Sequence, residues 1–379
     1  MNSFPIHPPR LIDSTLRDGE QSPGVAFTKK EKITLARMLD SVGIDEMEVG
    51  TPAMGEEVCE TIRQIVKLRL NSRICVWSRA LEEDIEKGAS TGAEAIHIAF
   101  PVSFRQLGAM GKDWTWVEQR LARIVEHAKK YFRYVSVGAQ DASRCDLEQL
   151  FRFIDMADNL RVSRIRLADT VGLFTPLSLM SLLEQIRRIY PALPIDFHGH
   201  NDLGMATANA LTAWQCGATD LSVTVNGLGE RAGNAALEEV VMSLSQVVKV
   251  KKYETTGLFS LCSYVASISR RPIPDCKPVT GNLVFSHESG VHAKCTIKDP
   301  IAFQAFDGKL VGRESASNVF GKHSGKASVK HFLEERNLKI SESQLSVLLT
   351  RIKVMAQENK RGVMPSEVVR VYQNVVKCV

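Results

Sequence analysis

The hydrophobic and polar positions of the first 250 residues alternate between two periods. Short apolar runs, rich in β-branched residues and typical of buried strands, recur at 10–13, 47–49, 74–77, 95–98, 134–137, 165–167, 195–198 and 221–225. Stretches with the spacing of amphipathic helices lie between them, at 28–42, 55–69, 81–91, 114–130, 146–159, 176–190, 203–216 and 235–249. Thr28 with Glu31, and Thr175 with Pro176, mark two of the helix starts.

The order of these elements predicts the fold class. Strand–helix repeats require parallel strands joined by right-handed crossovers. Eight such units in about 240 residues are typical of an α/β protein with a (β/α)8 TIM barrel. An open doubly wound sheet is the alternative, but no G-x-G-x-x-G motif follows the first strand.

The pattern changes after the eighth unit. A helix is expected at 257–269, followed by prolines at 272, 274 and 278 that interrupt regular structure. A glycine- and histidine-bearing loop region is expected at 281–325, and three helices at 325–337, 341–359 and 365–377. We therefore expect a barrel domain at 1–275 and a small, mostly helical C-terminal subdomain at 276–379.

Composition narrows the class of protein. The 379 residues are 44% hydrophobic and 24% charged, without a run of about 18 apolar residues, so we expect a globular chain and no membrane span. Net charge is +5, but basic and acidic residues are intermixed, which argues against a nucleic-acid partner. Eight scattered cysteines without a C-x-x-C pair, and no secretory signal, favour a cytoplasmic protein with free thiols.

Polar residues with ligand chemistry follow the predicted strands, on the face that carries catalysis in TIM barrels. His198 and His200 are two residues apart at the end of a strand, so both imidazoles point the same way. Asp18 offers a carboxylate and Asn234 an amide oxygen, a set that suits Mg²⁺, Mn²⁺, Fe²⁺ or Zn²⁺. A hydrogen-bonded histidine pair without metal and a non-haem iron triad remain alternatives.

Other polar features are open to two interpretations. The glycine-rich segment 226–234 precedes a helix and fits either an anion cradle or a tight turn. His97 lies within a strand, where a core histidine with a hydrogen-bond partner is the expectation. Glu48 ends a strand and is expected to contact the residues that bind the metal, without binding the metal itself.

Three motifs resemble the signatures of the DRE-TIM metallolyase family: DSTLRDGEQ at 13–21, HGHND at 198–202 and NGLGERAGNA at 226–235. Within it the chain resembles the Claisen-condensing branch of homocitrate, 2-isopropylmalate and citramalate synthases, including SGVH at 289–292 and GKHSG at 321–325. EVGTPAMG at 48–55 and VSVG at 135–138 are most similar to the homocitrate synthase of nitrogen-fixing bacteria, which supplies homocitrate for the nitrogenase cofactor.

The resemblance implies a divalent metal, acetyl-CoA and a 2-oxo acid as substrates, and a homodimer. It implies metal ligands at Asp18, His198, His200 and Asn234, and catalytic residues at Arg17 and His292, the latter completing the partner's site. It implies contacts to the 2-oxo acid from Gln21, Arg79 and Thr170.

Three positions depart from the family pattern. Gln140 stands where a glutamate is usual, Phe303 where 2-isopropylmalate synthases have a tyrosine, and Ser136 where lysine-pathway homocitrate synthases have an arginine that grips the distal carboxylate of 2-oxoglutarate. Arg79 is therefore the candidate for that carboxylate. A carbon–carbon lyase and a barrel without activity are the rival functions.

Overall fold

The structure is a computed structural model that describes residues 7–299, 301–313 and 317–377. The chain forms two compact units, one that ends at Ile273 and one that begins at Pro274. The boundary thus lies two residues before the expected one, next to the prolines that interrupt regular structure. Each unit is described by itself.

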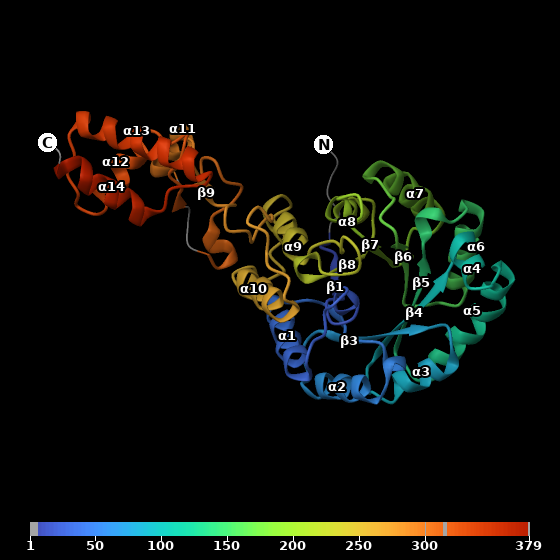
Figure 1. The fold of residues 1–379 in the computed structure, drawn as a ribbon. Helices are drawn as coiled ribbons and strands as arrows, with labels where there is room; N and C mark the ends of the chain where they lie inside the picture. The colour runs from blue at the N-terminus through green and yellow to red at the C-terminus, as the bar shows by residue number, and fades with distance from the viewer. Residues whose placement is uncertain (1–6, 300, 314–316, 378–379) are drawn as a thin grey trace. The chain divides into compact units, whose positions relative to one another are not determined.

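The first unit is built on eight parallel strands that close into a barrel (Figure 1). The strands are β1 (Arg10–Asp13), β2 (Glu46–Glu48), β3 (Arg73–Arg79), β4 (Ala95–Pro101), β5 (Tyr134–Gln140), β6 (Arg164–Asp169), β7 (Ile195–Gly199) and β8 (Asp220–Val223). Each strand pairs with its neighbour in sequence, and β1 pairs with β8 to close the ring. The predicted TIM barrel is confirmed.

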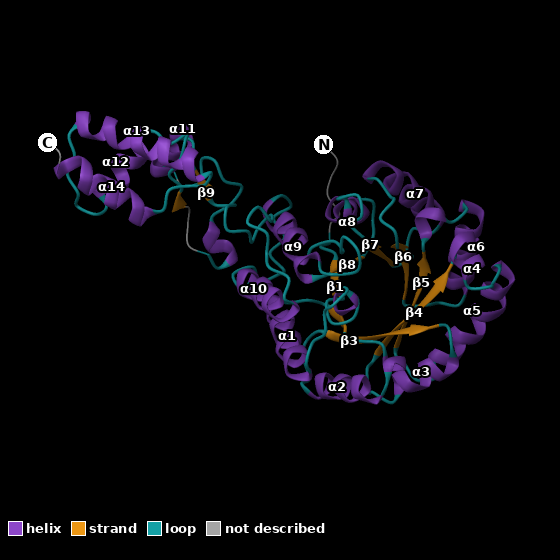
Figure 2. Ribbon diagram, in the orientation of Figure 1, coloured by secondary structure: helices purple, strands orange, loops and turns teal. Residues whose placement is uncertain are grey.

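Helices surround the strands on the outside of the barrel, as Figure 2 shows. They are α1 (Lys29–Val42), α2 (Glu56–Lys67), α3 (Glu82–Ala89), α4 (Phe104–Ala109), α5 (Trp114–Ala128), α6 (Leu147–Asn159), α7 (Pro176–Ile189), α8 (Ala206–Gln215), α9 (Leu237–Gln246) and α10 (Leu258–Ser269). Thr28 and Glu31 form the expected capping box of α1. Thr175 caps α7 ahead of Pro176. The short α4 is the one barrel helix among these that the hydrophobic period does not predict.

The inside of the barrel is unusually polar. Side chains alternate between the two faces of each strand, so Ile165 and Leu167 of β6 face the helices while Arg164 and Arg166 face inward. Arg164 pairs with Glu46 of β2, and Arg166 pairs with Glu48 two residues further along the same strand. We name these pairs the lower ion-pair layer (Glu46–Arg164) and the upper ion-pair layer (Glu48–Arg166).

The second unit is mostly helical and has its own core. Its elements are β9 (Ser286–His287), α11 (Gly290–Lys298), the 3-10 helix η5 (Gly308–Val311), β10 (Ser317–Asn318), α12 (Lys326–Glu334), α13 (Glu342–Asn359) and α14 (Pro365–Lys377). Phe320, Val329, Leu348 and Ile352 belong to a buried apolar cluster under the last three helices. The loop expected at 281–325 is wrong in part, because α11 and the β9–β10 pair lie within it.

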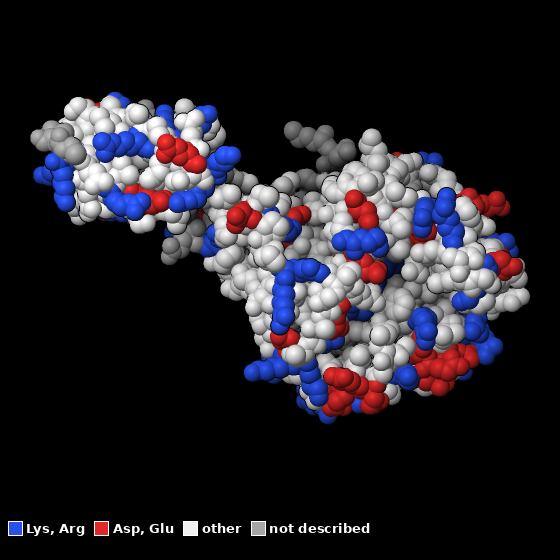
Figure 3. Space-filling view, viewed as in Figure 1, with Lys and Arg blue, Asp and Glu red and all other residues white. Residues whose placement is uncertain are grey.

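Surface and thiol features can be read in the same terms. Basic and acidic residues lie intermixed on the face drawn in Figure 3. In the described part of the chain, no helix has both the length and the apolarity needed to cross a bilayer. The cysteines within the same ranges are free thiols.

Candidate metal centre and substrate pocket

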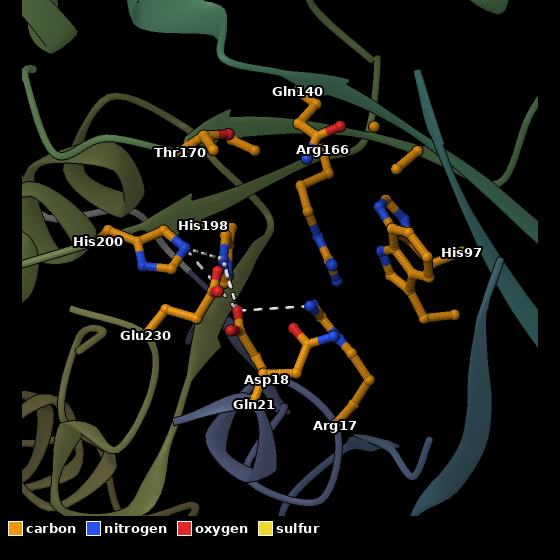
Figure 4. Close-up of a pocket in the computed structure, with 14 residues that line it drawn as sticks. Arg17, Asp18, Gln21, His97, Gln140, Arg166, Thr170, His198, His200 and Glu230 are labelled. Carbon is orange, nitrogen blue, oxygen red and sulfur yellow. Dashed lines mark hydrogen bonds and ion pairs between the residues drawn. The ribbon is translucent and has the colours of Figure 1, made fainter. Parts of the chain in front are cut away.

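Three side chains converge at the carboxyl end of the barrel strands. His198 lies on β7 and His200 directly follows it, whereas Asp18 follows β1 at the start of the 3-10 helix η1 (Gly19–Gln21). Nε2 of His198 lies 3.1 Å from Oδ2 of Asp18, and Nε2 of His200 lies 3.9 Å from it. One ligand atom from each residue falls within 4.8 Å of the others (Figure 4). The geometry fits a metal centre.

The charge states at this point also suit a metal ion. All three residues are buried. Burial opposes the charge of Asp18, but Arg17 and His198 outweigh it and lower the pKa of the carboxyl group. Burial, reinforced by His198, lowers the pKa of His200 to about 4. An ionised carboxylate and a neutral imidazole are the forms that bind metal.

The two ring Nε2 atoms face each other at 3.3 Å. The Nδ1 atom of each ring is buried and has no hydrogen-bond partner among the described residues. No described residue therefore holds the Nδ1 atoms of these histidines, although metal-ligating histidines usually donate the second nitrogen to a partner.

Asn234 stands beside this triad. Its backbone forms an isolated antiparallel bridge with His200. Its Nδ2 donates to the carbonyl oxygen of Leu228 at 3.1 Å, whereas its buried Oδ1 has no partner among the described residues. A buried amide oxygen without a partner is costly, which supports Asn234 as a fourth ligand group.

The glycines around Asn234 allow the chain to fold tightly on itself. A Cβ added to Gly233, where φ is +89°, would lie 1.9 Å from the carbonyl oxygen of Gly227. A Cβ on Gly229 would lie 2.2 Å from Nδ2 of Asn234. Only glycine fits such approaches, so the segment 226–234 is a tight turn that positions Asn234, which favours the turn over the anion cradle.

Arg17 is held in place by Glu48. Nε and Nη2 of Arg17 donate to Oε2 of Glu48 at 3.0 and 2.8 Å. Its Nη1 lies 3.5 Å from Oδ2 of Asp18. Burial opposes the charge of Glu48, but Arg166 and Arg17 outweigh it and keep the pKa of Glu48 well below its usual range. Glu48 thus supports the site from behind, and Arg17 adds a fixed positive charge beside the triad.

A cavity of about 190 Å³ lies beside the triad, and neither Glu48 nor Asn234 is among the residues that line it. Of the residues singled out from the sequence, Arg17, Asp18, Gln21, Thr170, His198 and His200 line it. The other lining residues are Trp77, His97, Ala99, Gly138, Gln140, Arg166, Ala168 and Glu230. His97 is buried and lies 2.8 Å from Oγ of Ser136 through its Nδ1, as expected for a core histidine, yet it also borders the cavity.

Trp77 and Arg166 are the lining residues that sequence reasoning missed. Arg166 carried a signal, because Arg164 and Arg166 alternate with apolar residues on a barrel strand, and inward parity puts both guanidinium groups inside the barrel. Trp77 lies on the same face of β3 as Arg79, the last residue of the strand. An aromatic residue on a strand, however, more often packs in a core than binds a ligand.

Arg79 is not brought to the pocket. Its Nε and Nη2 bond to the two carboxylate oxygens of Asp84 at 2.7 and 2.9 Å, and its side chain is 59% exposed. Asp84 lies in the first turn of α3, so the guanidinium turns toward that helix. His292 lies on α11 in the second unit, where its ring stacks on Phe303 with centroids 4.1 Å apart.

Comparisons of the sequence point to one family. The model of the HMGL-like family matches residues 8–265, and that of the "homocitrate synthase post-HMGL domain-like" family matches residues 279–360. The chain is 41% identical to 2-isopropylmalate synthase 2 of Caldanaerobacter subterraneus over 97% of this chain and 96% of that protein. It is 39% identical to homocitrate synthase 1 of a Nostoc species over the same shares of the two chains.

Two further matches agree with these. A putative (R)-citramalate synthase of Archaeoglobus fulgidus is 37% identical over 93% of this chain and 72% of that protein. Hydroxymethylglutaryl-CoA lyase from Pseudomonas aeruginosa, a solved structure, aligns with a TM-score of 0.63 over 70% of this chain and 94% of that one, at 19% identity, which speaks for the fold alone. The chain belongs to the HMGL-like family, among synthases named for homocitrate, 2-isopropylmalate and citramalate.

Proposed function

We propose that the protein is a homocitrate synthase, which condenses acetyl-CoA with 2-oxoglutarate and releases CoA. The observation that carries the proposal is the convergence of Asp18, His198 and His200 beside Arg17 in one pocket. Relatives named homocitrate synthase support the substrate. A relative named 2-isopropylmalate synthase is as similar, so other 2-oxo acids belong in the test.

The donor set fits a divalent ion. Asp18, His198, His200 and Oδ1 of Asn234 offer one carboxylate, two imidazoles and an amide oxygen, which suit Mg²⁺, Mn²⁺, Fe²⁺ or Zn²⁺. When bound, such an ion supplies Lewis-acid polarisation of the ketone of the 2-oxo acid.

The chain's own groups bind and orient the 2-oxo acid. Arg17 places its positive charge beside the ketone oxygen, which gains negative charge as the new carbon–carbon bond forms. Oγ1 of Thr170 accepts a hydrogen bond from the backbone N–H of Asp141 at 2.8 Å, which leaves its O–H to donate to a substrate oxygen. Gln21 lines the same side of the cavity as Arg17 and can donate through its amide (Figure 4).

His292 is the proposed base. Its imidazole takes a proton from the methyl group of acetyl-CoA, directly or through a water, in the role of a general base. The resulting carbanion attacks the ketone carbon, the carbonyl electron pair moves to the oxygen, and that oxygen takes up a proton. Water then cleaves the thioester, which yields free CoA and the carboxylate of the product.

We also propose a homodimer in which His292 reaches the partner's barrel. Large apolar side chains stand exposed in loops and helix starts after the strands, among them Met54 (77%), Leu177 (73%) and Leu203 (61%). In the second unit, Val291 (69%) and Phe303 (44%) are exposed close to His292 in sequence or space. The proposal predicts that the partner chain covers some of these apolar side chains.

The test is the release of CoA thiol from acetyl-CoA on addition of 2-oxoglutarate, 2-oxoisovalerate or pyruvate, with the product identified by mass spectrometry. We expect the highest kcat/KM with 2-oxoglutarate and homocitrate as product. Release only with another 2-oxo acid would reassign the substrate. Cleavage of hydroxymethylglutaryl-CoA without any condensation would reassign the protein as a lyase, and no reaction in either assay would contradict enzymatic activity.

A further inference from the structure

The part of the pocket away from the metal triad is lined by one permanent cation. Arg166 rises from β6 between Gln140 and Arg17 in the close-up (Figure 4). Its side chain is only 3% exposed. Trp77, His97 and Gly138 line the cavity beside it. A Cβ on Gly138 would lie 2.6 Å from Nε2 of His97, so glycine at this position leaves room for the imidazole ring.

The guanidinium of Arg166 is only partly satisfied by the protein. Its Nε donates to Oδ2 of Asp196 at 2.5 Å, and its Nη1 forms an ion pair with Oε1 of Glu48 at 2.6 Å. Nη2 is buried and has no hydrogen-bond partner among the described residues. Burial opposes the charge, but Asp196 and Glu48 outweigh it and raise the pKa of Arg166, so the group stays a cation.

Both acids beside Arg166 also bind other groups, although Oε1 of Glu48 has no hydrogen-bond partner among the described residues. Glu48 is shared with Arg17, whose Nε and Nη2 occupy Oε2. Asp196 also accepts from Oγ of Ser222 at 3.0 Å through Oδ1. Nη2 of Arg166 thus lacks an acceptor among the described residues, and a buried donor without one is unfavourable.

We propose that Arg166 binds the distal carboxylate of a dicarboxylic 2-oxo acid, whose other end lies at Asp18, His198 and His200. The inference rests on the proposed function and names the group that selects the substrate class. A carboxylate supplies a charge-assisted acceptor for Nη2. An apolar substrate side chain leaves this donor unpaired, and sites built around such a donor reject analogues that lack the acceptor.

This assignment replaces Arg79, which the sequence favours for the same role. Both Nε and Nη2 of Arg79 are taken by Asp84, and Arg79 is not among the residues that line the cavity. Arg166 has the opposite properties, since it is buried, lines the cavity and keeps one nitrogen unpaired. The two arginines therefore give a matched pair of variants.

The experiment compares kcat/KM for 2-oxoglutarate and 2-oxoisovalerate in the full-length enzyme with its metal. Arg166→Lys keeps a cation between Glu48 and Asp196, so we expect this variant to fold. Circular dichroism tests whether it does. We expect the preference for 2-oxoglutarate to fall by roughly ten- to a hundredfold, the range for one lost buried hydrogen bond to a charge. In Arg166→Met the preference should reverse, and in Arg79→Met it should stay.

Two results would overturn the assignment: a folded Arg166→Lys enzyme with the wild-type preference, or an Arg79→Met enzyme that loses it. A wild-type enzyme that prefers 2-oxoisovalerate would also refute the inference while leaving the condensation reaction intact. Failure of the wild-type enzyme with every 2-oxo acid would instead refute the proposed function itself.

Discussion

The lower and upper ion-pair layers join the same two strands, but their arginines differ in which nitrogen lacks a hydrogen bond within the described residues. In the lower layer, Nη1 and Nη2 of Arg164 both bond to Glu46, and Nη1 also lies 3.5 Å from Asp220. Arg73 adds a second guanidinium to Glu46 at 3.1 Å. In the upper layer, Nη2 of Arg166 has no hydrogen-bond partner among the described residues, and Glu48 pairs with both Arg166 and Arg17.

The difference separates support from function within one barrel. The lower layer lies toward the amino ends of the strands, where its terminal guanidinium nitrogens are bonded and only Nε of Arg164 lacks a hydrogen bond. The upper layer lies two residues nearer the carboxyl ends, where TIM barrels carry catalysis. There Nη2 of Arg166 is buried without a hydrogen-bond partner among the described residues, and Glu48 orients Arg17. We expect substitutions in the two layers to have opposite effects on activity and stability.

The largest effect is expected at the metal centre above the upper layer. His198→Ala should lose bound metal and about 10³-fold or more in kcat/KM, because several kcal/mol of electrostatic stabilisation disappear. Its thermal unfolding midpoint should change little, since the residue lies in no ion-pair layer. Metal analysis, the thiol-release assay and calorimetry measure the three quantities. A metal-free variant, or a chelated wild-type enzyme, with full turnover would refute the metal centre.

Arg17 tests whether the upper layer orients a catalytic charge. Arg17→Gln removes the guanidinium beside Asp18, and we expect kcat to fall by about 10²–10³-fold, as for the loss of one preorganised donor. KM for the 2-oxo acid should change much less, because the charge acts mainly where negative charge develops. Arg17→Lys keeps a positive charge but loses the pair of hydrogen bonds to Glu48. This variant should recover part of kcat. Equal effects on KM and kcat would assign Arg17 to binding instead.

The lower layer should respond in stability and not in chemistry. Arg164→Met leaves Glu46 and Asp220 with fewer partners, and breaking a buried pair costs about 3–5 kcal/mol. The kinetic constants of the molecules that remain folded should stay near wild type. Arg123→Met is the matched control, because Arg123 also bonds to both oxygens of an acid, Glu82, but is 63% exposed. An exposed pair contributes far less to stability than a buried one, so urea unfolding should separate the two variants clearly.

Much of the barrel was predictable because each strand is a buried apolar run between a helix and a polar loop. Residues 165–167 and 195–198, for instance, lie within β6 and β7. Helix α4 has only six residues and is held by the side chain of Ser103, which accepts from the backbone N–H of Gln106, so it shows no helical period. Helix α11 begins at Gly290, within a segment whose glycines and histidines predict a loop. Its apolar residues show little of the spacing of an amphipathic helix.

The metal triad was predictable from local spacing, whereas the rest of the pocket depends on long-range contacts. His198 and His200 share a face because they are two residues apart on a strand. The orientation of Arg79 is set by its ion pair with Asp84. The alternation of residues along a strand does not predict this pair. Arg166 pairs with Glu48 and Asp196 on other strands, and these residues become its neighbours only when the barrel closes.

The smallest effect is expected in a test of which chain contributes His292 to the active site of a given barrel. We take one variant without His292 and one without His198, each inactive alone, and let their subunits exchange at equal amounts. Random pairing makes about half of the dimers mixed. If His292 serves the partner's barrel, each mixed dimer holds one intact site and one doubly damaged site, so about a quarter of wild-type activity returns. If exchange is verified by mass spectrometry and no activity returns, His292 acts within its own chain, and the proposed exchange between subunits is wrong.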